Sequence, residues 1–122
     1  MYKNQVLGKQ GENIATHYLI QNNYKILERN FNCYFGEIDI IAKDKNEYVF
    51  IEVKTRTSKQ YGNPVDAVTN IKQRHIWKST KYYVYINKLE NAYIRFDIIE
   101  ILKKENKFYL HHLYLNLFLE DE

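Results

Sequence analysis

The sequence predicts an α/β fold in which helices cover both faces of a mixed β-sheet. Two stretches carry helical patterns, several others are rich in β-branched and aromatic residues, and these stretches follow one another as helix, three strands, helix, two strands. Helices interspersed with strands in this way are typical of a sheet held between helical layers. We therefore expect a three-layer sandwich of order αβββαβ(β), formed by a single domain over residues 1–122.

The first helix is expected over residues 7–19. Its apolar residues recur at the i, i+4, i+7 spacing of one helix face, and the pair Asn22-Asn23 ends the helix. Glu12 and Gly8 lie on one shoulder of the apolar stripe. Glu12 therefore borders the buried face, where its carboxylate can lean over the sheet, and Gly8 leaves room beside it.

Three strands follow this helix as an antiparallel meander. The first spans residues 24–34, and Phe35-Gly36 forms the turn to the second, which spans 36–42. The third spans 48–54 and is preceded by the turn sequence Asp44-Lys45-Asn46-Glu47. All three strands are rich in the β-branched and aromatic residues that favour a sheet.

The register of the second hairpin brings charged residues together. A two-residue loop at its tip places Asp39 directly opposite Glu52 and Glu37 opposite Lys54. Because side chains alternate along a strand, all four project from one face. The opposite face is then apolar and consists of Ile38, Ile40, Val49, Ile51 and Val53. A three-residue loop with a bulge would shift this register by one residue.

The facing carboxylates of Asp39 and Glu52 require compensation. Directly opposed Cβ atoms lie ~5 Å apart, and two ionised carboxylates there repel by roughly 3 kcal/mol at an effective dielectric of about 20. Either one acid is protonated or cations neutralise the pair, and a hard divalent ion meets that need. Lys54 adds an ammonium that can orient water or stabilise charge on a phosphate. The alternative is a surface hairpin with solvated charges.

The second half of the chain supplies one helix and two strands. Residues 55–63 are polar and loop-like, and the helix is expected from Thr69, as its N-cap, to about Ile86. The two strands are expected over residues 92–102 and 108–119, and either supplies an edge at which two copies of the chain would pair.

Basic and aromatic residues of this half are expected to contact nucleic acid. Those in the loop would meet the phosphate backbone or, in the case of Tyr61, stack on an exposed base. In the helix, Arg74, Lys78 and Lys81 form a basic stripe that either tracks phosphates or is an ordinary solvated face. The residues are Arg56, Lys59, Tyr61, Lys72, Arg74, Lys78 and Lys81.

Composition narrows the class of protein. A net charge of +3 and a pI near 8.8 are compatible with a polyanionic partner. The single cysteine, Cys33, excludes an internal disulfide, the first residues lack the apolar stretch of a signal peptide, and no apolar run is long enough to span a membrane. These features predict a cytoplasmic protein with no membrane partner.

The motifs and the order of elements resemble the YraN family of small bacterial proteins. The matching segments extend over almost the whole chain: Gly8-Lys9-Gln10-Gly11-Glu12, Arg29-Asn30-Phe31, Gly36-Glu37-Ile38-Asp39-Ile40-Ile41-Ala42, Phe50-Ile51-Glu52-Val53-Lys54-Thr55-Arg56, Lys72-Gln73-Arg74 and Arg95-Phe96-Asp97. The fold of that family is restriction-endonuclease-like, in the superfamily that includes the archaeal-type Holliday junction resolvases.

The resemblance implies a nuclease-type site. Glu12, Asp39 and Glu52 would be its metal-binding acids and Lys54 its catalytic lysine. The reaction expected from these residues is hydrolysis of phosphodiester bonds in nucleic acid, with Mg²⁺ or Mn²⁺ held by the three acids and the Val53 carbonyl. The superfamily resemblance points to DNA, including branched DNA, as the substrate.

Two further residues are expected to support this site, Glu37 by an ion pair that holds Lys54 and Gln73 by orienting water or phosphate. Arg95 and Asp97 fall on one face of a late strand and are expected to form an internal salt bridge. The alternative function is a non-catalytic nucleic-acid-binding or adaptor module on the same fold, and the expected assembly is a homodimer formed through an edge strand.

Overall fold

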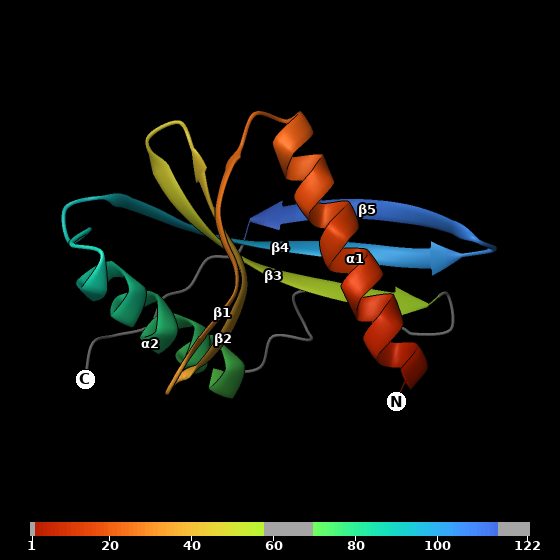
Figure 1. Cartoon of the computed structure of the whole chain (residues 1–122), viewed down its shortest axis with the longest axis horizontal. Helices are drawn as coiled ribbons and strands as arrows, with labels where there is room; N and C mark the ends of the chain where they lie inside the picture. Colours follow the sequence, from red (N-terminus) through yellow and green to blue (C-terminus); the bar gives the residue numbers. More distant parts are fainter. Residues whose placement is uncertain (1, 58–69, 115–122) are drawn as a thin grey trace.

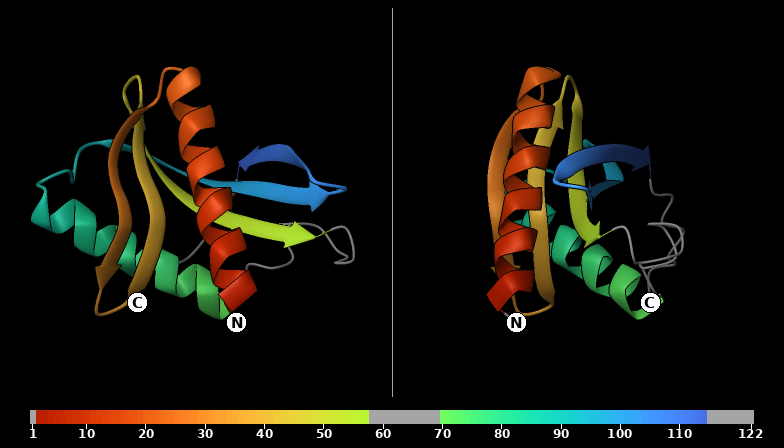
Figure 2. Two further views of the ribbon diagram at one scale, coloured as in Figure 1. Left: turned by 45° about the vertical axis from the view of Figure 1, so that its right-hand side comes forward. Right: turned by 90° about the vertical axis from the view of Figure 1, so that its right-hand side faces the viewer.

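The described part of the protein is a five-stranded mixed sheet with one helix on each face (Figure 1). The computed structural model describes residues 2–57 and 70–114. The elements along the chain are α1 (Tyr2–Gln21), β1 (Lys25–Cys33), β2 (Gly36–Asp44), β3 (Glu47–Thr57), α2 (Asn70–Ile86), β4 (Tyr93–Lys104) and β5 (Lys107–Tyr114). This order and the three layers, seen from two further sides in Figure 2, confirm the predicted fold class.

The strands lie in the sheet in chain order, from β1 to β5. All neighbours are antiparallel except β3 and β4, which are parallel and are separated in sequence by α2. β4 is therefore paired on both sides, and the expectation that residues 92–102 offer a free edge is wrong. Within the described ranges the edges of the sheet are β1 and β5. No described helix is long and apolar enough to cross a membrane.

Two hydrophobic clusters fill the spaces between the sheet and the helices. The cluster under α1 consists of Ala15, Leu19, Ile40, Ala42, Val49, Ile51, Ile99 and Ile101. The cluster under α2 consists of Phe31, Ile38, Ile41, Phe50, Ile76, Tyr83, Phe96 and Ile98. Full burial of each large aliphatic or Phe side chain in these clusters contributes about 1.5 to 3 kcal/mol. β3 and β4 send residues into both clusters, as expected for strands in the interior of a sheet.

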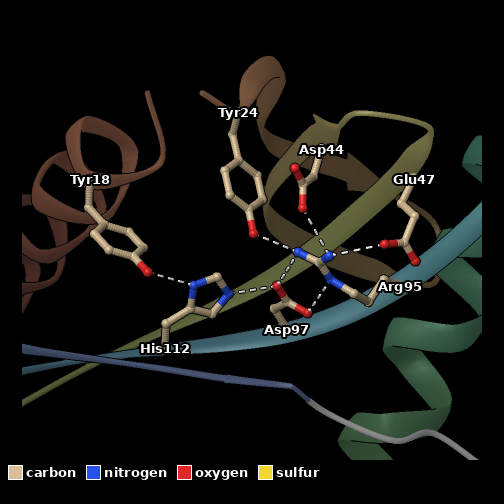
Figure 3. Close-up of polar contacts among 7 residues, drawn as sticks. All are labelled: Tyr18, Tyr24, Asp44, Glu47, Arg95, Asp97 and His112. Carbon is tan, nitrogen blue, oxygen red and sulfur yellow. Dashed lines mark hydrogen bonds and ion pairs between the residues drawn. The ribbon is translucent and has the colours of Figure 1, made fainter. Parts of the chain in front are cut away.

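One guanidinium joins strands that lie far apart in the sequence. Figure 3 shows Arg95 of β4 donating hydrogen bonds to both carboxylate oxygens of Asp97, each at 3.0 Å. It also donates to Asp44 at 3.1 Å, Glu47 at 3.2 Å and the Tyr24 hydroxyl at 2.6 Å. Burial alone would lower the pKa of Arg95, but its bonds to Asp97 outweigh that effect and raise the pKa. The predicted internal salt bridge between Arg95 and Asp97 is confirmed.

The same cluster extends to α1 through β5. His112 Nε2 lies 2.6 Å from Asp97 Oδ2, and His112 Nδ1 lies 2.9 Å from the Tyr18 hydroxyl (Figure 3). Tyr18 belongs to α1, so the chain of contacts from Arg95 to Tyr18 fixes that helix against the sheet. α1 also carries Glu12, one of the predicted site residues, so these contacts help to fix the position of Glu12 as well.

Side-chain alternation breaks in the middle of β1 and β2. Ile40 packs under α1 whereas Ile38 packs under α2, although regular alternation would place both on one face. Asn30, which lies on β1 across from this point between the pairs Arg29↔Ile40 and Phe31↔Ile38, has a φ of 53°. A left-handed residue interrupts the pleat. The expectation that Ile38 shares a face with Ile40 is therefore wrong.

Candidate active site

The candidate site lies where β2 separates from β3. The two strands pair from Asp44↔Glu47 to Ile40↔Ile51, which is the register predicted from a two-residue loop. Beyond that pair the ladder stops, and Figure 1 shows β2 turning away from β3. The Val53 N–H instead donates to Asp39 Oδ2 at 2.7 Å. A carboxylate side chain thus takes the place of a backbone acceptor and is fixed beside β3.

Asp39 and Glu52 are the next residues past the last ladder pair, and their carboxyl groups interact. Burial, the charge of Glu52 and a hydrogen bond with Glu52 raise the pKa of Asp39 to about 8, against the opposing effect of the Val53 N–H. The prediction that two acids confront each other here is confirmed, and the raised pKa of Asp39 keeps its carboxyl largely protonated at neutral pH.

Two lysines compensate the charge of Glu52, which is buried. Lys54 Nζ lies 3.6 Å from Glu52 Oε2, and the Lys72 ammonium of α2 forms an ion pair with the same oxygen. Burial opposes the charge of Lys72, but hydrogen bonds with Glu52 and Lys54 outweigh burial and raise its pKa. Burial and the hydrogen bond with Lys72 lower the pKa of Lys54. Lys54 is therefore the lysine of this pair that gives up its proton more readily.

The raised pKa of Asp39 makes a prediction about stability. The folded protein retains this proton up to a pH of about 8, whereas the unfolded chain loses it near the usual value of 3.8. The folded state thus binds more protons between these pH values, and stability must fall as the pH rises through that window. One pKa unit is worth about 1.4 kcal/mol, so the loss amounts to a few kcal/mol.

Urea denaturation in EDTA, from about pH 4 to about pH 8, measures this effect. We expect the free energy of unfolding of the wild-type protein to fall with pH relative to that of Asp39→Asn, which cannot titrate at this position. Parallel curves for the two proteins would show that Asp39 does not hold the proton.

Glu12 approaches the site from α1. It lines a cavity of about 300 Å³ together with Leu7, Gly8, Val53, Lys54, Thr55 and Thr57. Arg29 of β1 lies 3.5 Å from Glu12 and donates a hydrogen bond to the neighbouring Asn13 at 2.9 Å. The charge of Glu12 contributes to the raised pKa of Asp39. The expected lean of Glu12 over the sheet, with room at Gly8, is confirmed.

Close contact between α1 and β3 depends on Gly11. A Cβ at this position would lie 1.9 Å from the Thr55 hydroxyl oxygen, whereas a Cβ at Gly8 would meet no atom within 4 Å. We expect Gly11→Ala to push α1 off β3 and to lower the free energy of unfolding by about 1 to 3 kcal/mol. Gly8→Ala should instead add up to about 1 kcal/mol through helix propensity. Urea denaturation of the two variants tests this, and an equal gain in both would contradict the close packing.

The donor atoms at the site fit a hard divalent cation. Asp39 and Glu52 supply carboxylate oxygens that interact with each other. On β3, Val53 stands between Glu52 and Lys54, and its N–H donates to Asp39. A cation is already present there in the form of the Lys72 ammonium on Glu52. Within residues 2–57 and 70–114 no three acidic, histidine or cysteine side chains converge on one point. The preformed unit is therefore the pair Asp39 and Glu52, with Glu12 at greater range.

The structure places the other predicted site residues differently. Lys54 pairs with Glu52, where an ion pair with Glu37 was expected. Burial raises the pKa of Glu37, followed by the charges of Glu12 and Glu52, and the Lys72 ammonium opposes this rise. Strands β2 and β3 no longer pair beyond Ile40↔Ile51, and Glu37 therefore does not reach Lys54. Gln73 is half-buried on α2, next to Lys72.

The residues expected to bind nucleic acid fall into four groups. Arg56 is not directed at solvent but donates to Glu100 of β4, with its Nε 2.6 Å from Glu100 Oε2. The stripe on α2 is exposed as predicted and consists of Arg74, Lys78 and Lys81. Lys59, Tyr61 and the expected N-cap Thr69 lie outside the described residues. Lys72 was expected to meet phosphates, and its contact with Glu52 was missed because only the packing of α2 on the sheet brings the two together.

Comparison with known proteins places this site in a family. The family described as "Uncharacterised protein family UPF0102" matches residues 11–101, a span that includes the site residues. A UPF0102 protein of Clostridium perfringens is 52% identical over 98 residues, which make up 80% of this chain and 80% of that relative. A UPF0102 protein of Clostridium botulinum is 52% identical over 102 residues, 83% of each chain. The chain thus belongs to the uncharacterised protein family UPF0102, the YraN family that its motifs resemble.

Proposed function

We propose that this protein is a metal-dependent nuclease that hydrolyses phosphodiester bonds in nucleic acid, with DNA as its substrate. The observation that carries the proposal is the close approach of Asp39 and Glu52, with Lys54 beside them, at the end of the β2–β3 ladder. Folding gains nothing from two facing acids, one of which must hold a proton at neutral pH. A divalent cation, in contrast, requires such a pair of oxygen donors.

Each residue of the site has a role in this reaction. Asp39, Glu52 and the Val53 carbonyl would hold Mg²⁺ or Mn²⁺, with Glu12 as a further acid, and the ion would supply Lewis-acid activation of the phosphate and of water. The Val53 N–H orients the Asp39 carboxylate for that role. The lowered pKa of Lys54 makes its ammonium easier to deprotonate, and the resulting amine could take a proton from the attacking water.

Lys72 and Gln73 of α2 complete the site. The Lys72 ammonium balances Glu52 and is available to a phosphate oxygen once a metal ion takes over that task. Gln73, one residue further along the helix, is a candidate for orienting the water or the phosphate. Glu37 lies close enough to Lys72 for its charge to be partly balanced there.

Branched DNA is the substrate suggested by the superfamily. A four-way junction presents two strands for cutting, so it would need two sites and therefore a dimer. β5 is the predicted edge strand that remains for such pairing, because β4 is covered. A protein that stays strictly monomeric at high concentration in sedimentation would remove this basis for junction cleavage.

A non-catalytic nucleic-acid-binding module is the second candidate. The observation in its favour is that Glu52 is already neutralised by Lys72, and that the described acids do not form a preassembled trio. A module that only binds has no use for two facing acids, one of them protonated, beside a phosphate backbone. For this reason we favour the nuclease.

Incubation with Mn²⁺ or Mg²⁺ and a panel of nucleic acids separates the two candidates. The panel contains single-stranded, duplex, forked and four-way DNA, and RNA. We expect cleavage by the wild-type protein, loss of cleavage in Lys54→Ala, and normal cleavage in Lys43→Ala, which removes a lysine from the far end of the same hairpin. Binding without cleavage under every metal would support the module instead.

A further inference from the structure

A groove of about 560 Å³ lies between the β1–β2 turn and α2. We call it the hairpin groove. Its walls are Asn32, Cys33, Tyr34, Phe35, Gly36 and Glu37 from the hairpin, and His75 and Lys78 from the helix. In Figure 1 the turn lies next to the first turns of α2. Gly36 suits this turn because its φ of 141° is one that other residues rarely adopt, and a Cβ there would lie 3.6 Å from the His75 Cβ, an ordinary packing distance.

An aromatic run crosses the groove from the turn to the helix. Tyr34 is 97% exposed, and its ring meets the Phe35 ring edge-on at 5.4 Å between centroids. Phe35 in turn meets Tyr82 of α2 at 6.5 Å. A ring as exposed as that of Tyr34 buries almost no surface and so contributes little to folding. Its faces are open to a planar partner from solution.

Positive charge accompanies these rings. Arg74, Lys78 and Tyr82 follow one another at four-residue spacing and so lie along one face of α2, and all three are exposed. Lys78 also forms part of the groove wall. The alternation of exposed rings with cationic side chains is the pattern that single-stranded nucleic acid requires, because rings stack on bases and cations follow the phosphates.

The groove ends at the candidate active site. Glu37 forms part of its wall and lies within electrostatic reach of Glu12 and Glu52. His75 lies one helical turn after Lys72, which pairs with Glu52. Among the described wall residues Glu37 is the acid, and it is the residue through which the groove adjoins Glu12 and Glu52.

We propose that the hairpin groove binds an unpaired nucleotide next to the bond to be cut, with its base stacked on Tyr34 and its phosphates along Lys78 and Arg74. The proposal rests on the proposed nuclease function and names its substrate class, which is DNA with unpaired bases beside a duplex, as in a fork or flap. Paired bases within a duplex are already stacked on both faces, so only an unpaired base can use the Tyr34 ring. Stacking is tolerant of base identity, so little sequence preference is expected.

Fluorescence anisotropy tests this with a labelled fork and a blunt duplex of equal length, both in EDTA so that binding is measured without cleavage. We expect Tyr34→Ala to weaken binding of the fork by about 5- to 150-fold, the range that corresponds to loss of one stacked base. Binding of the blunt duplex should change less than about twofold. Tyr34→Phe retains the ring and should bind the fork as the wild type does.

Tyr85→Ala is the matched control, since Tyr85 is 75% exposed at the other end of α2 and lies outside the groove. It should leave fork binding unchanged. Unchanged fork binding in Tyr34→Ala, an equal loss on fork and duplex, or a wild-type protein that binds neither would overturn the proposal.

If the fork binds through Tyr34 but no substrate is cut in Mn²⁺, the groove assignment stands and the nuclease function falls. If the wild type cleaves and Tyr34→Ala binds forks normally, the nuclease function stands and the groove assignment falls.

Discussion

Asp39→Asn is expected to reduce cleavage at least on the order of 10³-fold, since even residues that only support metal ligands are worth about 10- to 100-fold. The amide keeps the size of the side chain and its hydrogen bond to the Val53 N–H, which Asp39 accepts at 2.7 Å. It loses the negative charge that a divalent cation requires. The loss therefore reports on metal binding and not on collapse of the hairpin. Initial rates of fork cleavage in Mn²⁺ measure it.

Asp44→Asn is the matched control for this variant. It makes the same change on the same strand, but at the β2–β3 turn, where Asp44 accepts a hydrogen bond from Arg95 at 3.1 Å. We expect it to cost about 1 kcal/mol or less of stability and to cleave at the wild-type rate. Equal activity of Asp39→Asn and Asp44→Asn would remove Asp39 from the active site.

The largest expected loss of stability comes from Asp97→Ala. The Asp97 side chain is completely buried and takes two hydrogen bonds from Arg95 and one contact from His112. Its removal leaves a guanidinium that is 17% exposed without its main counter-charge, a change that typically costs about 3 to 5 kcal/mol. Since whole domains are stable by only about 5 to 15 kcal/mol, the midpoint of urea denaturation should fall sharply.

Glu47→Ala tests the explanation by removing a different partner of the same guanidinium. Glu47 lies 3.2 Å from Arg95, but its side chain is 44% exposed. Solvent screens such a pair, so its loss should cost at most about 1 kcal/mol. If Glu47→Ala and Asp97→Ala proved equally destabilising, burial of Asp97 would not be the reason for its importance.

The register of the β2–β3 hairpin was predictable because residues close together in the sequence determine it. A two-residue loop between Asp44 and Glu47 fixes the register of everything beyond it, and Lys45 in that loop has the positive φ, 55°, that such tight loops use. That register places Asp39 and Glu52 next to each other just past the last pair, and the Val53 N–H then fixes the Asp39 carboxylate there. The helical pattern of α2 was equally local, and the face that carries Ile76, Thr80 and Tyr83 is buried.

Other features depend on contacts that sequence spacing does not encode. Arg56 was expected to face phosphates, but β3 continues to Thr57 and its parallel neighbour β4 places Glu100 within reach of the guanidinium. The pairing of Lys72 with Glu52 requires the final position of α2. The change of face between Ile38 and Ile40 accompanies a left-handed Asn30 on the adjacent strand, which the alternation of apolar residues does not reveal.

The proton on Asp39 provides the most direct test of the claim that Asp39 and Glu52 together bind a metal ion. A divalent cation must displace that proton, because the raised pKa of Asp39, about 8, leaves most of the carboxyl protonated at pH 7. Calorimetric titration with Mn²⁺ in two buffers of different ionisation enthalpy counts the protons released. We expect close to one proton per bound ion at pH 7 and almost none at about pH 9. Heats at pH 7 that do not depend on the buffer, or Asp39→Asn protein that binds Mn²⁺ as tightly as the wild type, would contradict it.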